Sequence, residues 1–479
     1  MRTMWAIAVL VALGAVMANA EDAPVIDIGS RLEPFVDRYL VDSLEGARLD
    51  LKEPRPAEAV IRFDNPWEGS FCGYVTVIKD GILYHAYYRG VPEAGNDGNA
   101  EEVTCYAVSV DGIVWNKPDL GLYEVYGTRK NNIILAGSPP FSHNFAPFLD
   151  ARPGVAPEER FKALAGTSES GLVAFVSGDG IHWRKLREEP VIVVKEFAFD
   201  SQNVSFWSEH EQCYVCYFRT WDGFRTVSRS TSPDFVTWSE PVMMTYGDTV
   251  REHLYTNQTR PYFRAPHIYL SIAARFMPER RVISEAAMTA LGGDAKYSGD
   301  CSDTVLFSTR GGNVYDRTFM ESFVRPGIGE ENWTSRTNYP AYALIPSGES
   351  EMSFYINRNY GQKSAYLQRM TLRLDGFASV QAPYAGGQMT TKPLTFAGKE
   401  LVLNYATSAA GSLWVELQDA AGQPLAGFTQ AEADEIVGDQ IERTVTWQGK
   451  SDVSALAGTP IRLRFILKDA DLYSIRFRE

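Results

Sequence analysis

Three stretches of the chain repeat one pattern: residues 109–115 read SVDGIVW, residues 177–183 read SGDGIHW, and residues 232–238 read SPDFVTW. Looser copies follow at 308–315 (STRGGNVY) and 374–377 (LDGF). Ser and Asp side chains satisfy backbone groups in a tight turn, Gly tolerates a positive φ, and Trp packs between neighbouring sheets. Five units of about 66 residues, with about four strands each, are typical of a propeller. We therefore predict a five-bladed β-propeller over residues 30–378, closed by the N-terminal segment.

The sequence pattern changes after Asp375. Strand-like runs continue, but the turn motif is absent, and between residues 461 and 468 apolar side chains alternate with charged ones. That alternation is typical of a strand with one buried face and one solvated face. About 100 residues of this kind indicate a second domain, a C-terminal β-sandwich over residues 380–479. The predicted fold class is all-β.

The N-terminus reads as a signal peptide over residues 1–20. Arg2 precedes an apolar run that ends near Met17, and Ala18-Asn19-Ala20 is a small-x-small cleavage site. We expect a secreted or periplasmic protein with no membrane partner.

The charge balance narrows the choice of partners further. The chain has 60 acidic and 46 basic residues, a net charge of −14, which argues against a nucleic-acid partner. The sequence contains no Gly-rich phosphate loop, HExxH motif, nucleophile elbow or metal-ligand cluster, so neither a cofactor nor a metal is expected.

Taken together, the signal peptide, the five S-x-D-G-x-x-W units and the terminal sandwich resemble the five-bladed β-propeller glycosidases. The layout is similar to family 32 enzymes, which carry a C-terminal sandwich, and to family 43 enzymes. The family 32 W-x-N-D-P-N-G, R-D-P and E-C segments are not present; the most similar stretches of sequence are residues 63–67, 199–203 and 251–255. The resemblance thus implies a fold and a carbohydrate substrate, but not sucrose or fructan.

Glycoside hydrolysis needs one protonated and one ionised carboxyl group, and in a propeller these lie on the innermost strands. Asp64, Asp200 and Glu252 stand at the entrances of the first, third and fourth predicted blades. We expect Asp64 to be the base or nucleophile, Asp200 to orient the substrate, and Glu252 to be the general acid. A structural role is the alternative for each: an Asx-turn at Asp64, hydrogen bonds between blades at Asp200, and a solvated strand end at Glu252.

Further polar and aromatic residues at blade entrances are candidates for substrate binding: His143, Asn203, His253, Tyr255, Asn257, Arg264, Trp333 and Arg336. Periodicity does not decide whether Glu252 or the opposite face of its strand, with Tyr255, lines the funnel. The arginines are suited to an anionic sugar, although surface salt bridges would explain them equally well.

The sequence therefore predicts a glycoside hydrolase acting on a poly- or oligosaccharide through carboxylates in the propeller funnel. One alternative is a carbohydrate-binding propeller without catalysis, which the missing family segments favour. A less favoured alternative is a lyase for anionic polysaccharides, suggested by His253 and Tyr255.

Overall fold

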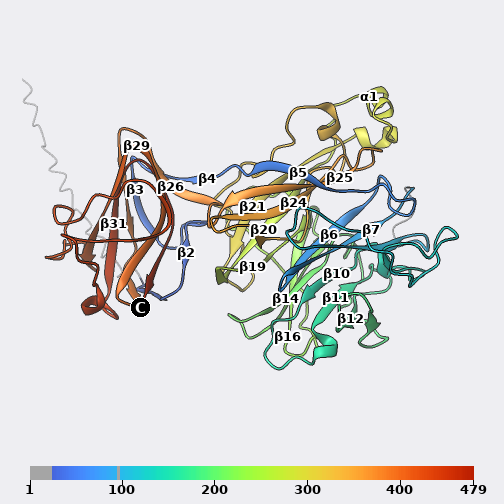
Figure 1. Cartoon of the computed structure of the whole chain (residues 1–479), viewed down its shortest axis with the longest axis horizontal. Coiled ribbons are helices and arrows are strands. Elements are labelled where there is room, and N and C mark those ends of the chain that lie inside the picture. The colour runs from blue at the N-terminus through green and yellow to red at the C-terminus, as the bar shows by residue number, and fades with distance from the viewer. Residues whose placement is uncertain (1–23, 94–97) are drawn as a thin grey trace, which may run out of the picture.

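The computed structural model describes residues 24–93 and 98–479. The predicted signal peptide, residues 1–20, lies outside them. The chain forms two lobes, a propeller and a smaller β lobe that contains the C-terminus (Figure 1). In the part of the chain that the structure describes, no helix is long and apolar enough to cross a membrane.

Five separate sheets make up the propeller, so the predicted five-bladed architecture is confirmed. Blade 1 contains β6 (Gly73–Asp80), β7 (Leu83–Gly90), β8 (Val103–Ser109) and β9 (Ile133–Leu135). Blade 2 contains β10 (Ala146–Leu149), β11 (Phe161–Ala165), β12 (Val173–Ser177) and β13 (Arg184–Lys185). Blade 3 contains β14 (Val204–Ser208), β15 (Cys213–Trp221), β16 (Arg225–Ser232) and β17 (Val242–Met243).

The last two blades have divided inner strands. Blade 4 contains β18 (His253–Asn257), β19 (Arg260–Tyr262), β20 (Ala265–Met277) and β21 (Cys301–Thr309). Blade 5 contains β22 (Tyr339–Pro340), β23 (Ile345–Pro346), β24 (Glu351–Arg358), β25 (Tyr366–Arg373) and the N-terminal strand β5 (Arg55–Arg62). Strand β5 pairs antiparallel with β25, which confirms that the N-terminal segment closes the ring.

The repeated motif builds the turn between the third and fourth strands and attaches it to the preceding blade. In the second copy, Ser177 accepts a hydrogen bond from the Gly180 amide (2.9 Å), and Asp179 accepts from the amides of Ile181 and His182 (2.9 and 2.8 Å). Gly180 has a φ of +75°. The ring of Trp183 packs edge-on against Phe145 of its own blade and Tyr87 of blade 1. The copies at 109–115 and 232–238 repeat these hydrogen bonds.

A substitution at Gly180 tests the importance of this attachment. A Cβ atom there would overlap the hydroxyl of Tyr87, which is fully buried and has no room to move. We expect Gly180→Ala to lower the free energy of unfolding by about 2–4 kcal/mol, because overpacking adds to the strain of a positive φ. Chemical denaturation would measure it. Gly223→Ala is the matched control: φ is +71° but no atom lies within 4 Å, so a loss of only about 1 kcal/mol is expected. Equal losses would contradict the packing argument.

The smaller lobe is a ten-stranded β structure around one apolar core, consistent with a β-sandwich. Its C-terminal strands are β26 (Ala378–Ala382), β27 (Gly387–Thr391), β28 (Leu394–Phe396), β29 (Glu400–Asp419), β30 (Asp439–Thr444) and β31 (Ile461–Arg478). Four strands come from the other end of the chain: β1 (Ile26–Gly29), β2 (Glu33–Pro34), β3 (Val41–Glu45) and β4 (Arg48–Leu51). The expected propeller span of 30–378 therefore includes strands β2, β3 and β4, which pair within the smaller lobe. Their alternation is too short to indicate which sheet they join.

Polar contacts join the two lobes. Asp375 accepts hydrogen bonds from Tyr262 of blade 4 (2.6 Å) and Ser474 of the sandwich (2.7 Å). Arg310 of blade 4 pairs with the buried Glu33 at 2.9 Å.

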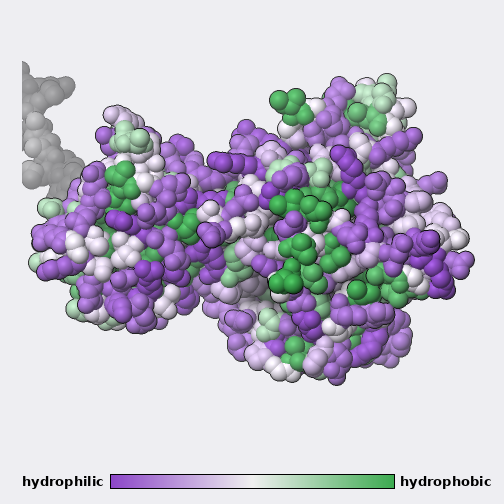
Figure 2. All heavy atoms as spheres, viewed as in Figure 1, coloured by the Kyte–Doolittle hydropathy of each residue, from purple (hydrophilic) through white to green (hydrophobic). Residues whose placement is uncertain are grey.

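Figure 2 shows hydrophobic side chains across the middle of the propeller lobe, surrounded by hydrophilic ones.

Removal of residues 380–479 is expected to leave the N-terminal strands β1 to β4 without most of their partners. A chain ending at Ser379 would keep strands β1 to β4 but lose most of their partners, exposing apolar residues such as Phe35 and Leu40. We expect aggregation, measured by size-exclusion chromatography. A chain limited to residues 52–378 lacks these unpaired strands and should be more soluble. A soluble, fully active chain ending at Ser379 would contradict the supporting role of the sandwich.

Candidate active site

The candidate site lies at one mouth of the central channel. The inner strands β6, β10, β14, β18 and β22 run side by side around the axis, so the residues at their starts meet at the same rim. The segments before and within these starts supply Tyr74, His143, Asp200, Tyr255 and Tyr339. One residue from each blade thus reaches the same opening.

Asp200 is the central carboxylate of this group. Its oxygens accept a hydrogen bond from Tyr255 at 3.0 Å and a longer one from Tyr74 at 3.5 Å, and Arg219 lies 3.4 Å away. The side chain is 35% exposed, so a ligand can reach it. Burial raises the pKa of Asp200, but the contact with His143 and the charge of Arg219 outweigh burial and hold this pKa well below its usual range. Asp200 is therefore ionised at neutral pH.

His143 connects Asp200 to a second carboxylate. It is fully buried at the end of a short 3-10 helix, η1 (Phe141–His143), with Nδ1 3.1 Å from Glu102 and Nε2 3.7 Å from Asp200. Burial lowers the pKa of His143, but its contacts with Asp200 and Glu102 outweigh burial and raise it above the ordinary histidine value. His143 therefore connects the two carboxylates, Asp200 and Glu102, and both favour its protonated form.

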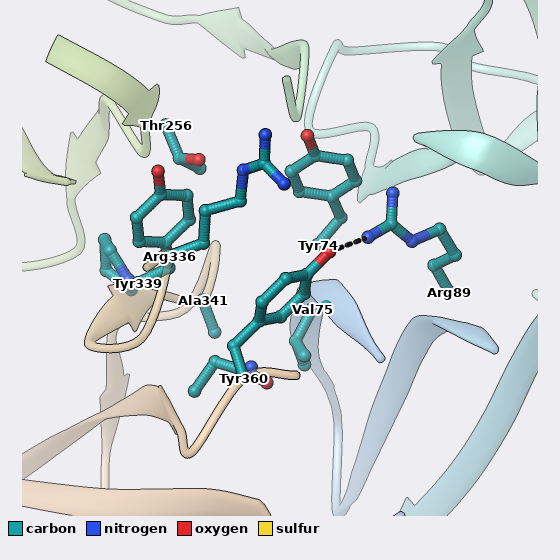
Figure 3. Close-up of a pocket in the computed structure, with 11 residues that line it drawn as sticks. Tyr74, Val75, Arg89, Thr256, Arg336, Tyr339, Ala341 and Tyr360 are labelled. Atoms are coloured by element: carbon teal, nitrogen blue, oxygen red, sulfur yellow. Dashed lines mark hydrogen bonds between the residues drawn. The ribbon is translucent and has the colours of Figure 1, made fainter. Parts of the chain in front are cut away.

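Arg336 reaches the same opening from the loop before β22. Figure 3 shows its guanidinium beside Tyr74, near Tyr339 and Tyr360. Within residues 24–93 and 98–479, Arg336 makes no ion pair with a carboxylate, and its Nε is buried without a hydrogen-bond partner. Burial lowers the pKa of Arg336, but the surrounding tyrosines, Tyr255 first, raise it above its ordinary value, so the side chain stays a cation.

Two adjoining hollows form the mouth. An open depression of about 750 Å³ is lined by His143, Asp200 and Arg219. A pocket of about 30 Å³ is lined by Tyr74, Arg336 and other residues drawn in Figure 3. Tyr74, which lines the small pocket, contacts Asp200, which lines the depression, so the two hollows are neighbours. The first has room for sugar rings, whereas the second admits only a small group.

Asp300 is a second carboxyl group, linked to this mouth through its electrostatic interaction with Arg336. It precedes β21, after the insertion that carries α1 (Glu285–Ala290) and the 3-10 helix η3 (Ala295–Ser298). Its Oδ1 is buried without a hydrogen-bond partner. Burial raises the pKa of Asp300, while a hydrogen bond with Ser335 and the charges of Arg336 and Arg225 lower it; the net shift is upward. The two carboxyls thus have pKa values shifted in opposite directions.

The structure does not bring Asp64 and Glu252 to this mouth. The Asp64 side chain is 72% exposed and pairs with Lys117 at 3.0 Å. Glu252 pairs with Arg275 at 2.9 Å and with Arg317. It is Tyr255, three residues along the chain, that reaches Asp200.

Of the eight residues predicted to bind substrate, the structure gathers His143, Tyr255 and Arg336 around Asp200. The other five lie in different surroundings: Asn203 bonds the carbonyls of Phe199 and Ser201, His253 packs among aromatic rings, Asn257 bonds Ser271 inside blade 4, Arg264 pairs with Asp375 between the lobes, and Trp333 bonds the carbonyl of Gly327. All five stand near blade entrances in sequence, but their side chains turn toward local partners.

Several residues of the site were not predicted: Tyr74, Arg89, Glu102, Arg219, Asp300, Tyr339 and Tyr360. Tyr74 lies in a predicted inner strand, so the alternation of that strand could have indicated it. Glu102 and Arg219 lie in or beside outer strands and reach the mouth through long side chains, which no sequence pattern indicates.

Comparison with models of protein families finds no match for the sequence, and comparison with curated proteins finds none either. Among solved structures, the chain is similar to an N-acetylgalactosamine deacetylase from F. plautii in complex with blood group B trisaccharide (13% identity, 69% of this chain and 96% of that chain, TM-score 0.45). It is similar to a fructofuranosidase from Schwanniomyces occidentalis complexed with fructosylnystose (10% identity, 89% and 99%, TM-score 0.39). A third is a thermostable family-43 glycoside hydrolase (12% identity, 64% and 92%, TM-score 0.40). Glycoside hydrolases are thus among the solved proteins that this chain resembles, while its five-bladed fold rests on its own sheets.

Proposed function

We propose that the protein is a glycoside hydrolase that cleaves a poly- or oligosaccharide bearing acidic groups, at the mouth of the channel around Asp200. The observation that carries the proposal is an accessible, ionised carboxylate, Asp200, at the same mouth as a guanidinium, Arg336, that forms no salt bridge within residues 24–93 and 98–479. In a protein of net charge −14, an unpaired cation in a concave site favours a negatively charged ligand.

Asp200 and Asp300 fit the two carboxyl roles of glycoside hydrolysis. Asp200 stays ionised and would act as base or nucleophile, whereas Asp300 has a raised pKa and would donate a proton to the leaving oxygen. His143 and Arg219 would stabilise the charge of Asp200 between turnovers. The sugar ring would occupy the larger hollow, and its carboxylate or sulfate would enter the small pocket at Arg336.

A lyase reaction would need a tyrosine or histidine base next to the acidic sugar. Burial, reinforced by the negative charge of Asp200, raises the pKa of Tyr255, so this hydroxyl is a poor base at neutral pH. Elimination with Tyr255 as the base is therefore disfavoured, and we propose hydrolysis as the reaction. On the N-terminal sequence alone, we also propose export to the periplasm or the medium.

A panel of acidic and neutral oligosaccharides tests the proposal. We expect new reducing ends from acidic glycans, without the ultraviolet absorbance of an unsaturated sugar. Reducing ends with that absorbance would indicate a lyase, and binding without cleavage would indicate a carbohydrate-binding propeller. Cleavage of neutral glycans only, or no interaction with any glycan, would contradict the proposal.

A further inference from the structure

The channel has a second hollow at its opposite mouth. This pocket of about 490 Å³ lies where the inner strands end, and its lining includes Lys79, Trp207, Arg260, Phe263, Tyr342 and Pro346. Phe263 is 38% exposed although it is a large apolar side chain. Pockets of this size and aromatic content are typical of small-ligand sites.

A hydrogen-bonded plug separates this pocket from the candidate active site. Gln202 donates to Thr76 at 2.7 Å, and Gln258 donates to Gln202 at 2.7 Å and to the carbonyl of Pro340 at 2.9 Å. These residues come from blades 1, 3, 4 and 5 and are buried. A ligand at the opposite mouth would therefore be separate from a substrate at Asp200.

Arg260 gives this pocket an unpaired positive charge. Its guanidinium lies 5.0 Å from the centre of the Tyr342 ring, and its Nη1 is buried without a hydrogen-bond partner. Across the described ranges, 24–93 and 98–479, it makes no ion pair with a carboxylate. The indole Nε1 of Trp207, in the same lining, is also buried without a partner.

A partly buried cation without a counter-ion costs stability, and a buried hydrogen-bond donor without an acceptor adds to that cost. A carboxylate would complement the guanidinium fork of Arg260. If this carboxylate is attached to a ring, Trp207 and Phe263 would offer flat apolar surfaces to that ring.

We propose that this opposite mouth is a second binding site, which holds the carboxylate of an acidic sugar residue on Arg260. The choice of a sugar as the carrier rests on the proposed function. A polymeric substrate would then have two attachment points on one propeller, one at Arg336 and one at Arg260.

Calorimetric titration with a disaccharide that contains one uronic acid tests the proposal. In the full-length protein with Asp200→Asn, which limits cleavage, we expect two binding events, and Arg260→Lys should weaken one of them at least tenfold. The neutral disaccharide of the same linkage should not respond to Arg260→Lys. Lys79→Gln, which removes a charge from the rim of the same pocket, is the matched control and should change binding by less than about twofold.

Arg336→Gln separates the two proposals. If the proposed function is wrong, Arg336→Gln leaves uronate binding unchanged while Arg260→Lys still weakens it. If Arg260→Lys, folded by circular dichroism, binds like the parent, the second site is overturned. Arg260→Met provides a further check: it should lose binding while the thermal midpoint stays equal or rises, because the buried charge is gone. A lower midpoint with unchanged binding would assign Arg260 a purely structural role.

Discussion

Asp200→Asn is expected to lower kcat on the order of 10³-fold, because the amide cannot act as a base or nucleophile. The amide oxygen can still accept the hydrogen bond from Tyr255, so the geometry of the mouth should be kept. Steady-state kinetics on the cleaved oligosaccharide would measure the effect. Calorimetric titration should show substrate binding within a few fold of the parent protein.

Asp64→Asn is the matched control for this experiment. It makes the same chemical change in an exposed carboxylate that pairs with Lys117, so kcat should stay within about twofold of the parent. A loss at Asp64 comparable to that at Asp200 would restore the sequence-based prediction of Asp64 as base or nucleophile. An unchanged kcat in Asp200→Asn would contradict the proposed site.

Asp300→Asn should lower kcat on the natural bond by about 10²–10⁴-fold, since the leaving oxygen would lose its proton donor. An aryl glycoside with a good leaving group needs less protonation and should lose less. Burial raises the pKa of Asp300, so the parent keeps its proton to a higher pH than an ordinary aspartate, and kcat/KM should fall as the pH rises through that value. The variant should lack this alkaline fall.

Glu252→Gln distinguishes the two candidates for the proton donor. Glu252 pairs with Arg275 and Arg317, so its loss should lower stability and leave turnover near that of the parent. A large loss of kcat on the natural bond, with a smaller loss on the aryl glycoside, would favour the original prediction for Glu252 and contradict the assignment of Asp300.

The fold could be predicted because its signal is local and repeated. In the copies at 109–115 and 177–183, the hydrogen bonds that the Ser and Asp side chains make to the turn all lie within seven residues, so a short stretch of sequence is enough to predict the turn. The membership of strands β1 to β4 could not be predicted in the same way. Their partners lie more than 300 residues away, and the sequence of a short strand does not indicate which sheet the strand joins.

The site was predictable where a residue lies just before or within the start of an inner strand, as for Asp200 and Tyr255. The site was not predictable where membership depends on the direction in which a side chain points. Glu252 and Tyr255 belong to the same stretch, and only the packing of blades 3 and 4 determines that Tyr255 reaches Asp200. Asp300 follows an insertion outside the blade pattern, and its raised pKa depends on burial.

The pairing of the two ends of the chain has a consequence for biosynthesis. Strands β1 to β5 are made first, yet their partners lie between residues 366 and 478. At about 5–20 residues per second, a ribosome needs roughly 15–90 seconds to deliver those partners. During that interval the early strands have open edges, and neither lobe can close. A chain whose synthesis stops early therefore leaves both lobes incomplete, so proteases and chaperones can recognise unpaired strands in either lobe.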